Sequence, residues 1–358
     1  MADETTDSGT ACISAAGREY RSIMLYVVII FLLVAVFLYC LLGGADFGAG
    51  IIELFAGSNK EKIKSLVSNA MAPIWEANHM WVVITVVILF MGFPAVYTQV
   101  SISLYIPLIL LLIGVVLRGT AFTFRHYDAV QDGSQEIYSR IFAVSSLLVS
   151  FFFGLIIGAI VSGKITAAPE SFYEGYLHPW INLFSISTGV FICSLFVFTA
   201  SVYLISETTE KDLRELIIRK TKLATLVMVV SGAMVFIFSY VEDVDFAERF
   251  LNHPVSIVII VLATAALPLL WKIIEKGLIW PSRILAGVQL FFILAAFYLI
   301  YFPEVILMKN GDNITLFSAA APEATLTQLG WALIIGSLLI FPTLFYLYKV
   351  FKIDRDAG

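Results

Sequence analysis

Charged residues are scarce in this chain. Asp, Glu, Lys and Arg together make up 14% of the 358 residues, whereas 60% are hydrophobic, and the mean hydropathy is +0.93. Soluble domains carry about 25% charged residues, so the composition excludes a soluble globular protein and favours a chain that crosses the membrane many times. The net charge of −5 gives no indication of a nucleic-acid partner.

Residues that bind metals are also few. The three cysteines are Cys12, Cys40 and Cys193, and the four histidines are His79, His126, His178 and His253. The cysteines show no metal-ligand spacing, and only His79 lies near a predicted span, the others being assigned to loops. Low-spin haem needs facing axial ligands, so this chain is predicted to hold no haem or metal of its own. His79 is interpreted as a hydrogen-bonding partner.

Long apolar segments dominate the remaining sequence. A membrane helix needs about 20 apolar residues, and nine segments meet this requirement. They are residues 24–42, 74–93, 103–122, 141–161, 181–205, 224–241, 255–271, 284–302 and 329–350. The sequence therefore predicts an all-α integral membrane protein with nine transmembrane helices.

The basic residues alternate between the loops. One set of connections carries 17 of the 22 Lys and Arg residues, and the alternate set holds only Arg18, Arg21, Lys164, Arg249 and Lys309. The positive-inside rule places the richer set in the cytoplasm. The N-terminus is therefore predicted outside and the C-terminus inside, which requires an odd number of spans.

The predicted domain organisation is simple. Residues 1–23 form a polar outer tail, residues 24–352 the membrane domain and residues 353–358 a cytoplasmic tail. One cytoplasmic segment, residues 58–71, has the Ser-x-x-Glu form of a capping box followed by apolar residues at helical spacing. It predicts a short amphipathic helix on the inner membrane surface.

Two acidic residues lie at predicted span ends. Asp46 follows the first span, in Gly-Ala-Asp-Phe-Gly, and Glu76 begins the second. Ionisable side chains at membrane depth are costly and usually mark a proton, ion or substrate path. We interpret the two carboxylates as a proton entry. The alternative is that each caps a helix end or pairs with an interfacial lysine.

Polar and aromatic residues surround Glu76 in the sequence. His79 lies three residues later, on the same helix face, with Asn78 on an adjacent strip. Trp75 and Trp81 bracket this group. These neighbours predict that the Glu76 carboxylate is desolvated and suited to proton relay.

Two arginines end the third span on the same inner side. Arg118 is predicted to pair with a carboxylate or with a haem propionate of a neighbouring subunit. Alternatively, Arg118 and Arg125 both extend their side chains to the membrane surface.

Five spaced motifs occur in order. They are Gly-Gly-Ala-Asp-Phe-Gly (43–48), Pro-Ile-Trp-Glu-Ala-Asn-His-Met-Trp (73–81), Phe-Pro-Ala-Val-Tyr (93–97), Arg-Gly-Thr-Ala-Phe-Thr-Phe-Arg (118–125) and Trp-Ile-Asn-Leu-Phe (180–184). Together they resemble the motifs of subunit II of the cytochrome bd quinol oxidases, over roughly residues 24–352. Most of the resemblance lies in the first 125 residues.

The resemblance implies a fold, a partner and a function. It implies two four-helix bundles plus one peripheral helix, and a partner subunit I that holds haems b and d and binds quinol. The chain would be a haem-free subunit of a quinol:O₂ oxidoreductase that stabilises subunit I. It would contribute a cytoplasmic proton path through Asp46 and Glu76, supported by Trp75, Asn78, His79, Arg118 and Arg125. A structural quinone or lipid, and a small single-span subunit, are compatible with this assignment.

Some positions depart from the family pattern. Gly43 replaces the first acid of the family's Asp-Gly-Phe-Asp stretch, Glu76 replaces an Asp, and Thr123 replaces a Glu. The implied location is the cytoplasmic membrane of a bacterium or archaeon. Two other functional classes remain open from the residues alone: a proton-coupled secondary transporter, and a purely structural membrane subunit.

Overall fold

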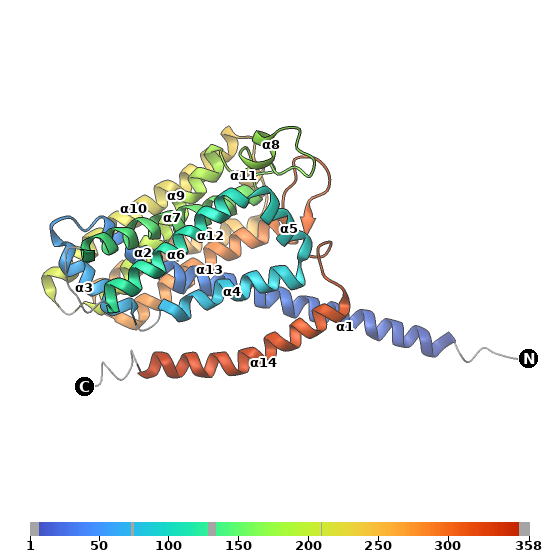
Figure 1. Cartoon of the computed structure of the whole chain (residues 1–358), viewed down its shortest axis with the longest axis horizontal. Coiled ribbons are helices and arrows are strands. Elements are labelled where there is room, and N and C mark those ends of the chain that lie inside the picture. Colours follow the sequence, from blue (N-terminus) through green and yellow to red (C-terminus); the bar gives the residue numbers. More distant parts are fainter. Residues whose placement is uncertain (1–6, 73–74, 128–133, 209, 351–358) are drawn as a thin grey trace, which may run out of the picture.

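The computed structural model describes residues 7–72, 75–127, 134–208 and 210–350. Most of these residues lie in long helices that run side by side (Figure 1). The α-helices are α1 (Asp7–Leu38), α2 (Gly44–Leu54), α3 (Lys60–Met71), α4 (Trp75–Gly92), α5 (Pro94–Ser103), α6 (Tyr105–Tyr127), α7 (Ser134–Ile160), α8 (Phe172–Tyr176), α9 (Leu183–Glu207), α10 (Lys211–Val241), α11 (Phe246–Leu251), α12 (Pro254–Glu275), α13 (Ile279–Tyr301) and α14 (Glu323–Tyr348). A π-helical turn, η1 (Tyr39–Gly43), joins α1 to α2, and a 3₁₀ turn, η2 (Gly57–Asn59), precedes α3.

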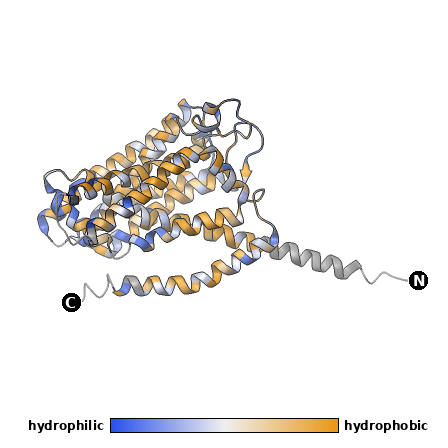
Figure 2. Cartoon of the chain, viewed as in Figure 1, coloured by the Kyte–Doolittle hydropathy of each residue, from blue (hydrophilic) through white to orange (hydrophobic). Residues whose placement is uncertain are grey.

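The predicted number of membrane helices is confirmed within the described residues. Nine helices are long and apolar enough to cross a bilayer. They are Ile23–Leu54, Trp75–Gly92, Tyr105–Arg125, Gln135–Ile160, Leu183–Glu207, Lys211–Val241, Pro254–Glu275, Ile279–Tyr301 and Glu323–Tyr346. Apolar residues fill the middle of these helices, whereas polar residues gather towards the ends of the bundle (Figure 2).

The first span is longer than the sequence predicts. The prediction ended it at residue 42, but the helix continues through η1 and α2 to Leu54. The prediction followed the apolar stretch, which ends before the glycines, and these glycines allow close packing within the helix. A Cβ atom on Gly48 would lie 2.0 Å from the backbone oxygen of Phe196 in α9. Small residues allow membrane helices to approach this closely.

Several other boundaries also differ from the prediction. The segment predicted as a polar tail is helical from Asp7 onward, and α10 begins at Lys211, well before the predicted residue 224. His126 was predicted in a loop, but it lies in the last turn of α6. The predicted cytoplasmic tail, residues 353–358, lies outside the described residues. Charged residues therefore extend helices beyond the apolar stretches that hydropathy detects.

The short helix α3 packs on the protein. Ile63, Leu66, Val67 and Ala70 are buried in the main core, where α3 contacts α2 and α9. Its apolar face is therefore turned towards the bundle rather than towards the membrane surface. The helix begins at Lys60 with no side-chain hydrogen bond at its N-terminus, so the predicted capping box is not formed.

The core is centred on α9, whose membrane segment is the most buried of the nine. It packs against α2, α7, α10 and α13. In contrast, α14 is mostly exposed, and its main neighbours are α1 and α4. Figure 1 shows α14 at one edge of the bundle. The grouping into two four-helix bundles stays a prediction.

The end of the bundle opposite α3 is closed by packed connections. A two-stranded antiparallel hairpin, β1 (Glu304–Ile306) and β2 (Ile314–Thr315), lies there. The Leu307 amide donates to the Ile160 carbonyl over 2.9 Å, and the Ala321 amide donates to the Gly92 carbonyl over 2.8 Å. These bonds fix the last long connection to the ends of two membrane helices.

Charged side chains join the connections at the same end. Glu242 forms an ion pair with Lys164 and accepts a hydrogen bond from the backbone amide of Leu183 over 2.9 Å. Partial burial alone would raise the pKa of the Glu242 carboxyl, but these two donors outweigh it and hold the pKa below its usual value. Arg249 lies 2.5 Å from Glu304 in a second such pair. The Glu242 carboxylate thus links the ends of α7, α9 and α10.

Candidate functional site

Asp46 lies inside the first membrane helix and is fully buried. It sits one turn after the π-helical turn η1, a feature that occurs often at functional sites. Gly48 and Gly50 follow it and bring α2 against α9 and α7: a Cβ on Gly50 would lie 2.2 Å from the Oγ of Ser146. Asp46 is therefore about two turns deeper than the span end at which the sequence placed it.

Arg118 is the main partner of Asp46. Its Nη2 atom lies 2.6 Å from Asp46 Oδ1, although the angles are not those of a hydrogen bond. Its Nε donates to Ser146 Oγ over 3.1 Å, and its Nη2 donates to the backbone oxygen of Asp46 over 3.4 Å. Of the alternatives left open by the sequence, the structure favours pairing with a carboxylate of this chain. Arg118 does not extend to the surface.

His79 completes this cluster. Its Nε2 atom lies 4.0 Å from Asp46 Oδ2 and 3.4 Å from Arg118 Nη1. Its ring packs against Phe47 and Trp75. A carboxylate, a guanidinium and an imidazole thus meet at one point between α2, α4 and α6.

A second buried ion pair, between Glu53 and Arg125, was missed by the sequence reasoning. Arg125 Nη1 donates to both carboxylate oxygens of Glu53, over 2.8 and 2.9 Å, and the two side chains are 1% and 2% exposed. Arg125 therefore does not reach the surface either. Glu53 lies seven residues after Asp46, so the two carboxylates are on one face of the first span. Arg125 likewise lies seven residues after Arg118, so the two guanidinium groups are on one face of α6. This shared spacing was the signal in the sequence.

Phe142 of α7 separates the two ion pairs. The Arg118 and Arg125 guanidinium carbons lie 4.9 and 4.3 Å from its ring centroid. Cations are attracted to aromatic faces at such distances. The fully buried Phe142 therefore contributes to positioning both arginines.

Glu76 is not part of this cluster. Its side chain is exposed on the surface of the chain, although the sequence predicted a carboxylate enclosed by tryptophans. The reason is the rotation of α4: Trp75 packs on Phe122, and Trp81 is buried beside Phe341 of α14. His79 faces Asp46, while Glu76, three residues earlier, lies at the start of the same helix and faces outwards.

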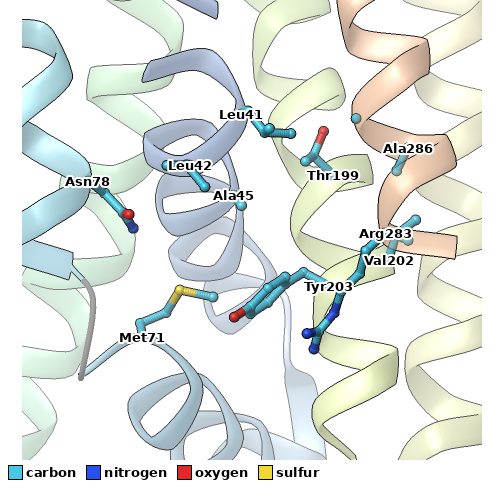
Figure 3. A pocket seen from close by; sticks show the side chains of 11 residues that line it. Leu41, Leu42, Ala45, Met71, Asn78, Thr199, Val202, Tyr203, Arg283 and Ala286 are labelled. Atoms are coloured by element: carbon cyan, nitrogen blue, oxygen red, sulfur yellow. The ribbon is translucent and has the colours of Figure 1, made fainter. Parts of the chain in front are cut away.

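Asn78 lies on another side of α4, where it lines a cavity of about 160 Å³. Figure 3 shows the Asn78 and Met71 side chains across this space from Tyr203 and Arg283. The Oδ1 atom of Asn78 is buried and has no hydrogen-bond partner among the described residues. The structure thus separates Asn78 from the Asp46 cluster, with which the sequence had grouped it.

Other buried polar atoms near Asp46 also have no hydrogen-bond partner among the described residues. They are both carboxylate oxygens of Asp46, Nδ1 of His79, and Nε and Nη2 of Arg125. Such atoms in proteins are commonly satisfied by water. An ionisable cluster with free hydrogen-bonding positions has the chemical equipment to accept, hold and pass on a proton.

Three of the four histidines have side chains that the structure describes: His79, His178 and His253. His79 Nε2 faces a guanidinium, which disfavours a metal ion at that nitrogen, and His178 and His253 lie in connections at the opposite end of the bundle from α3. Within the described residues, no three His, Cys, Asp or Glu side chains gather to hold a metal ion.

Comparison with known families identifies the type of protein. Residues 24–351 match the family model for cytochrome bd terminal oxidase subunit II. The chain belongs to this family. The resemblance inferred from the five sequence motifs is thereby confirmed.

Individual members of the cytochrome bd family are similar along most of the chain. Cytochrome bd ubiquinol oxidase subunit 2 of Bacillus subtilis (strain 168) is 25% identical over 334 residues, which cover 90% of this chain and 94% of the relative. Cytochrome bd-I ubiquinol oxidase subunit 2 of Escherichia coli (strain K12) is 22% identical over 356 residues, which cover 89% and 93%. The fold agrees with a solved bd oxidase from Geobacillus thermodenitrificans, with a TM-score of 0.74 at 17% identity, covering 92% of this chain and 99% of that one.

Proposed function

We propose that this chain is the haem-free subunit II of a quinol:O₂ oxidoreductase and carries protons from the cytoplasm towards the oxygen-reducing site of a partner subunit. The family match over residues 24–351 supports the oxidase assignment. The buried cluster of Asp46, Arg118 and His79 is the observation that carries the proton role. Ionisable groups buried in a membrane protein are expensive and usually functional.

The residues of this chain divide the work in the following way. Asp46 holds a transferred proton, and Arg118, 2.6 Å away, holds the carboxylate in place between transfers. His79 contacts both and accepts or donates a proton beside them. Glu76, exposed at the start of α4, collects protons at the cytoplasmic surface and is three residues, about one turn, from His79.

The orientation of the chain is part of the proposal. The 17-to-5 division of Lys and Arg residues places α3 and the C-terminus in the cytoplasm. Asp46, Glu53 and Glu76 then lie on the cytoplasmic half of the protein, with α3 beside them. A proton taken up there moves inwards along the first span.

The haems and the quinol site are assigned to subunit I, which this chain stabilises. Haem supplies the electron transfer and oxygen reduction. In this proposal the residues of this chain take no part in electron transfer or oxygen reduction, but they supply the protons that oxygen reduction consumes. The exposed apolar faces of the membrane helices give subunit I and lipid ample surface to cover.

Substitution of the two relay carboxylates tests the proton role. In the purified two-subunit complex, Asp46→Asn should lower the oxygen-consumption rate per haem by about tenfold or more, since a group that transfers protons typically contributes about 10²–10⁴-fold. Glu76→Gln should lower it less, because other surface groups can collect protons, and Glu76→Asp should retain most of the rate. Glu61→Gln, at an exposed carboxylate on α3, is the matched control and should not change the rate.

Haem content decides how the result is read. If Asp46→Asn assembles with the native haem spectrum and turns over at the native rate, Asp46 is purely structural. The proton route then runs through subunit I alone.

A further inference from the structure

The Glu53–Arg125 ion pair is not used by the proton route described so far. It is as deeply buried as the Asp46–Arg118 pair, yet Glu53 is only one residue from the end of α2. Lys60 and Lys64, from the α3 segment that covers this end, are close enough to act on Glu53 electrostatically. The pair therefore lies directly beneath the cytoplasmic surface of the bundle.

The two ion pairs have the same geometry. On α2 and on α6, their residues are seven positions apart, which is about two helical turns and about 10 Å along the axis. Because α2 and α6 both run towards the end where α3 lies, Glu53 and Arg125 are both on the cytoplasmic side of Asp46 and Arg118. The four residues form a ladder of two rungs, with one carboxylate and one guanidinium in each.

The space between the rungs contains groups that water can bridge. Phe142 lies between the guanidinium groups, so no side chain of the ladder connects the carboxylates directly. However, Nε and Nη2 of Arg125 and both oxygens of Asp46 are buried without hydrogen-bond partners among the described residues. Buried polar atoms of this kind are commonly satisfied by ordered water.

We propose that protons collected at the cytoplasmic surface, by Glu76 and other exposed groups, enter the buried part of the route through the Glu53 carboxylate, with Arg125 as its positioning partner. The inference rests on the proposed proton role of Asp46. A proton from cytoplasmic water binds the Glu53 carboxylate and releases it from Arg125. It then passes through water to the Asp46 carboxylate, and Glu53, ionised again, returns to Arg125. Only O–H bonds form and break, and the charge of each rung is restored.

A structural role for the pair makes a different prediction, and paired substitutions separate the two. Glu53→Gln alone leaves the Arg125 charge buried and uncompensated, which disrupts folding whatever the function. Glu53→Gln/Arg125→Gln removes both charges and keeps side-chain volume and hydrogen bonding. If the pair is purely structural, the double variant should therefore turn over at the native rate. If Glu53 carries protons, the double variant should turn over slowly even though it assembles.

The measurements are haem content, oxygen consumption per haem and its solvent deuterium isotope effect in the purified complex. We expect the double variant to assemble with native haem content but to turn over about tenfold or more slowly, with a larger isotope effect, because proton uptake limits the rate. The single variant Glu53→Asp, which keeps a carboxylate beside Arg125, should retain most of the native turnover rate. The control is Glu207→Gln/Arg283→Gln, which removes a carboxylate–guanidinium pair between α9 and α13 that is partly exposed, and it should leave turnover and isotope effect unchanged.

Asp46→Asn, measured in parallel, shows which proposal fails. If it slows turnover while the Glu53/Arg125 double variant runs at the native rate, the route through Asp46 stands and the entry through Glu53 is wrong. If neither change alters turnover in assembled complex, the proton role itself is wrong. Loss of haem in the double variant, with native haem in the control, would assign the pair to scaffolding and also overturn the proposal.

Discussion

At the residue scale, the site depends on glycines as much as on charged groups. Gly48 and Gly50 have no side chain where α2 meets α9 and α7, and this close contact positions Asp46 at the depth of Arg118 and His79. A methyl group at Gly48 would collide with backbone, which cannot rotate out of the way as a side chain can. The position of the Asp46 carboxylate therefore depends on the lack of side chains at Gly48 and Gly50.

Gly48→Ala should destabilise the protein by separating α2 from α9. Overpacking of this kind typically costs about 1–3 kcal/mol, so we expect a lower thermal unfolding midpoint and reduced haem content in the purified complex. The control is Gly336→Ala in α14, where a Cβ would meet nothing within 4 Å. Because alanine favours helix over glycine by up to about 1 kcal/mol, that change should be neutral or slightly stabilising. An unchanged midpoint for Gly48→Ala would show that the helix contact is looser than described.

At the element scale, connections at the end opposite α3 are joined by charge. Glu242, at the end of α10, binds Lys164 and caps the backbone amide of Leu183 at the start of α9. Because its pKa is held below the usual value in the folded protein, its stabilising contribution is present above the unfolded pKa of about 4.3. That contribution is lost as the pH falls through the lower folded-state value.

Glu242→Gln should therefore destabilise the protein at neutral pH but not in acid. Charged hydrogen bonds typically contribute about 1.5–3 kcal/mol, and we expect a midpoint for thermal unfolding several degrees lower at pH 7. The difference from the native protein should shrink as the pH falls below about 4. Glu248→Gln, at an exposed residue of the same connection, is the control. A difference that persists unchanged in acid would show that the carboxylate charge is not the stabilising feature.

Much of the element scale could be predicted from hydropathy, whereas the site could be predicted only in part. The nine spans follow from apolar length alone. Asp46 and Arg118 were found because they stand in motifs, but Glu53 was overlooked because the first span was predicted to end at residue 42, whereas the helix continues to Leu54. The exposure of Glu76 depends on which face of α4 meets its neighbours, and a helix with apolar residues on all sides does not reveal that face.

At the scale of the whole molecule, polarity is concentrated in two layers separated by an apolar band (Figure 2). The helix α1 starts and α14 ends at opposite ends of the bundle (Figure 1), as an odd number of spans requires. The layer that contains α3 is rich in Lys and Arg, whereas the opposite layer carries few of them. By the positive-inside rule, this asymmetry predicts that the layer with α3 faces the cytoplasm.

The orientation can be tested with reporter fusions. A reporter after Gly358 should be active in the cytoplasm, and one inserted after Asn310, between β1 and β2, should be active outside, because the basic residues are retained on the inner side. An insertion after Asn59, beside α3, is the internal control and should agree with Gly358. If the reporters after Gly358 and Asn310 reported the same side, the nine-span topology would be wrong.

The π-helical turn of the first span also has a geometric consequence. Such a turn contains one residue more than an α-helical turn, so the helix beyond it is rotated by about 100° relative to an uninterrupted α-helix. Val28 and Leu32 before Tyr39, and Asp46 and Glu53 after Gly43, thus belong to two periodic patterns that are out of phase. When each residue of this span is substituted in turn, the loss of assembly should follow the helical period on both sides of the π-helical turn. The two periodic patterns should be out of phase, with the change between residues 39 and 43. Removing one residue there would bring the two patterns into register and turn both carboxylates away from their arginines.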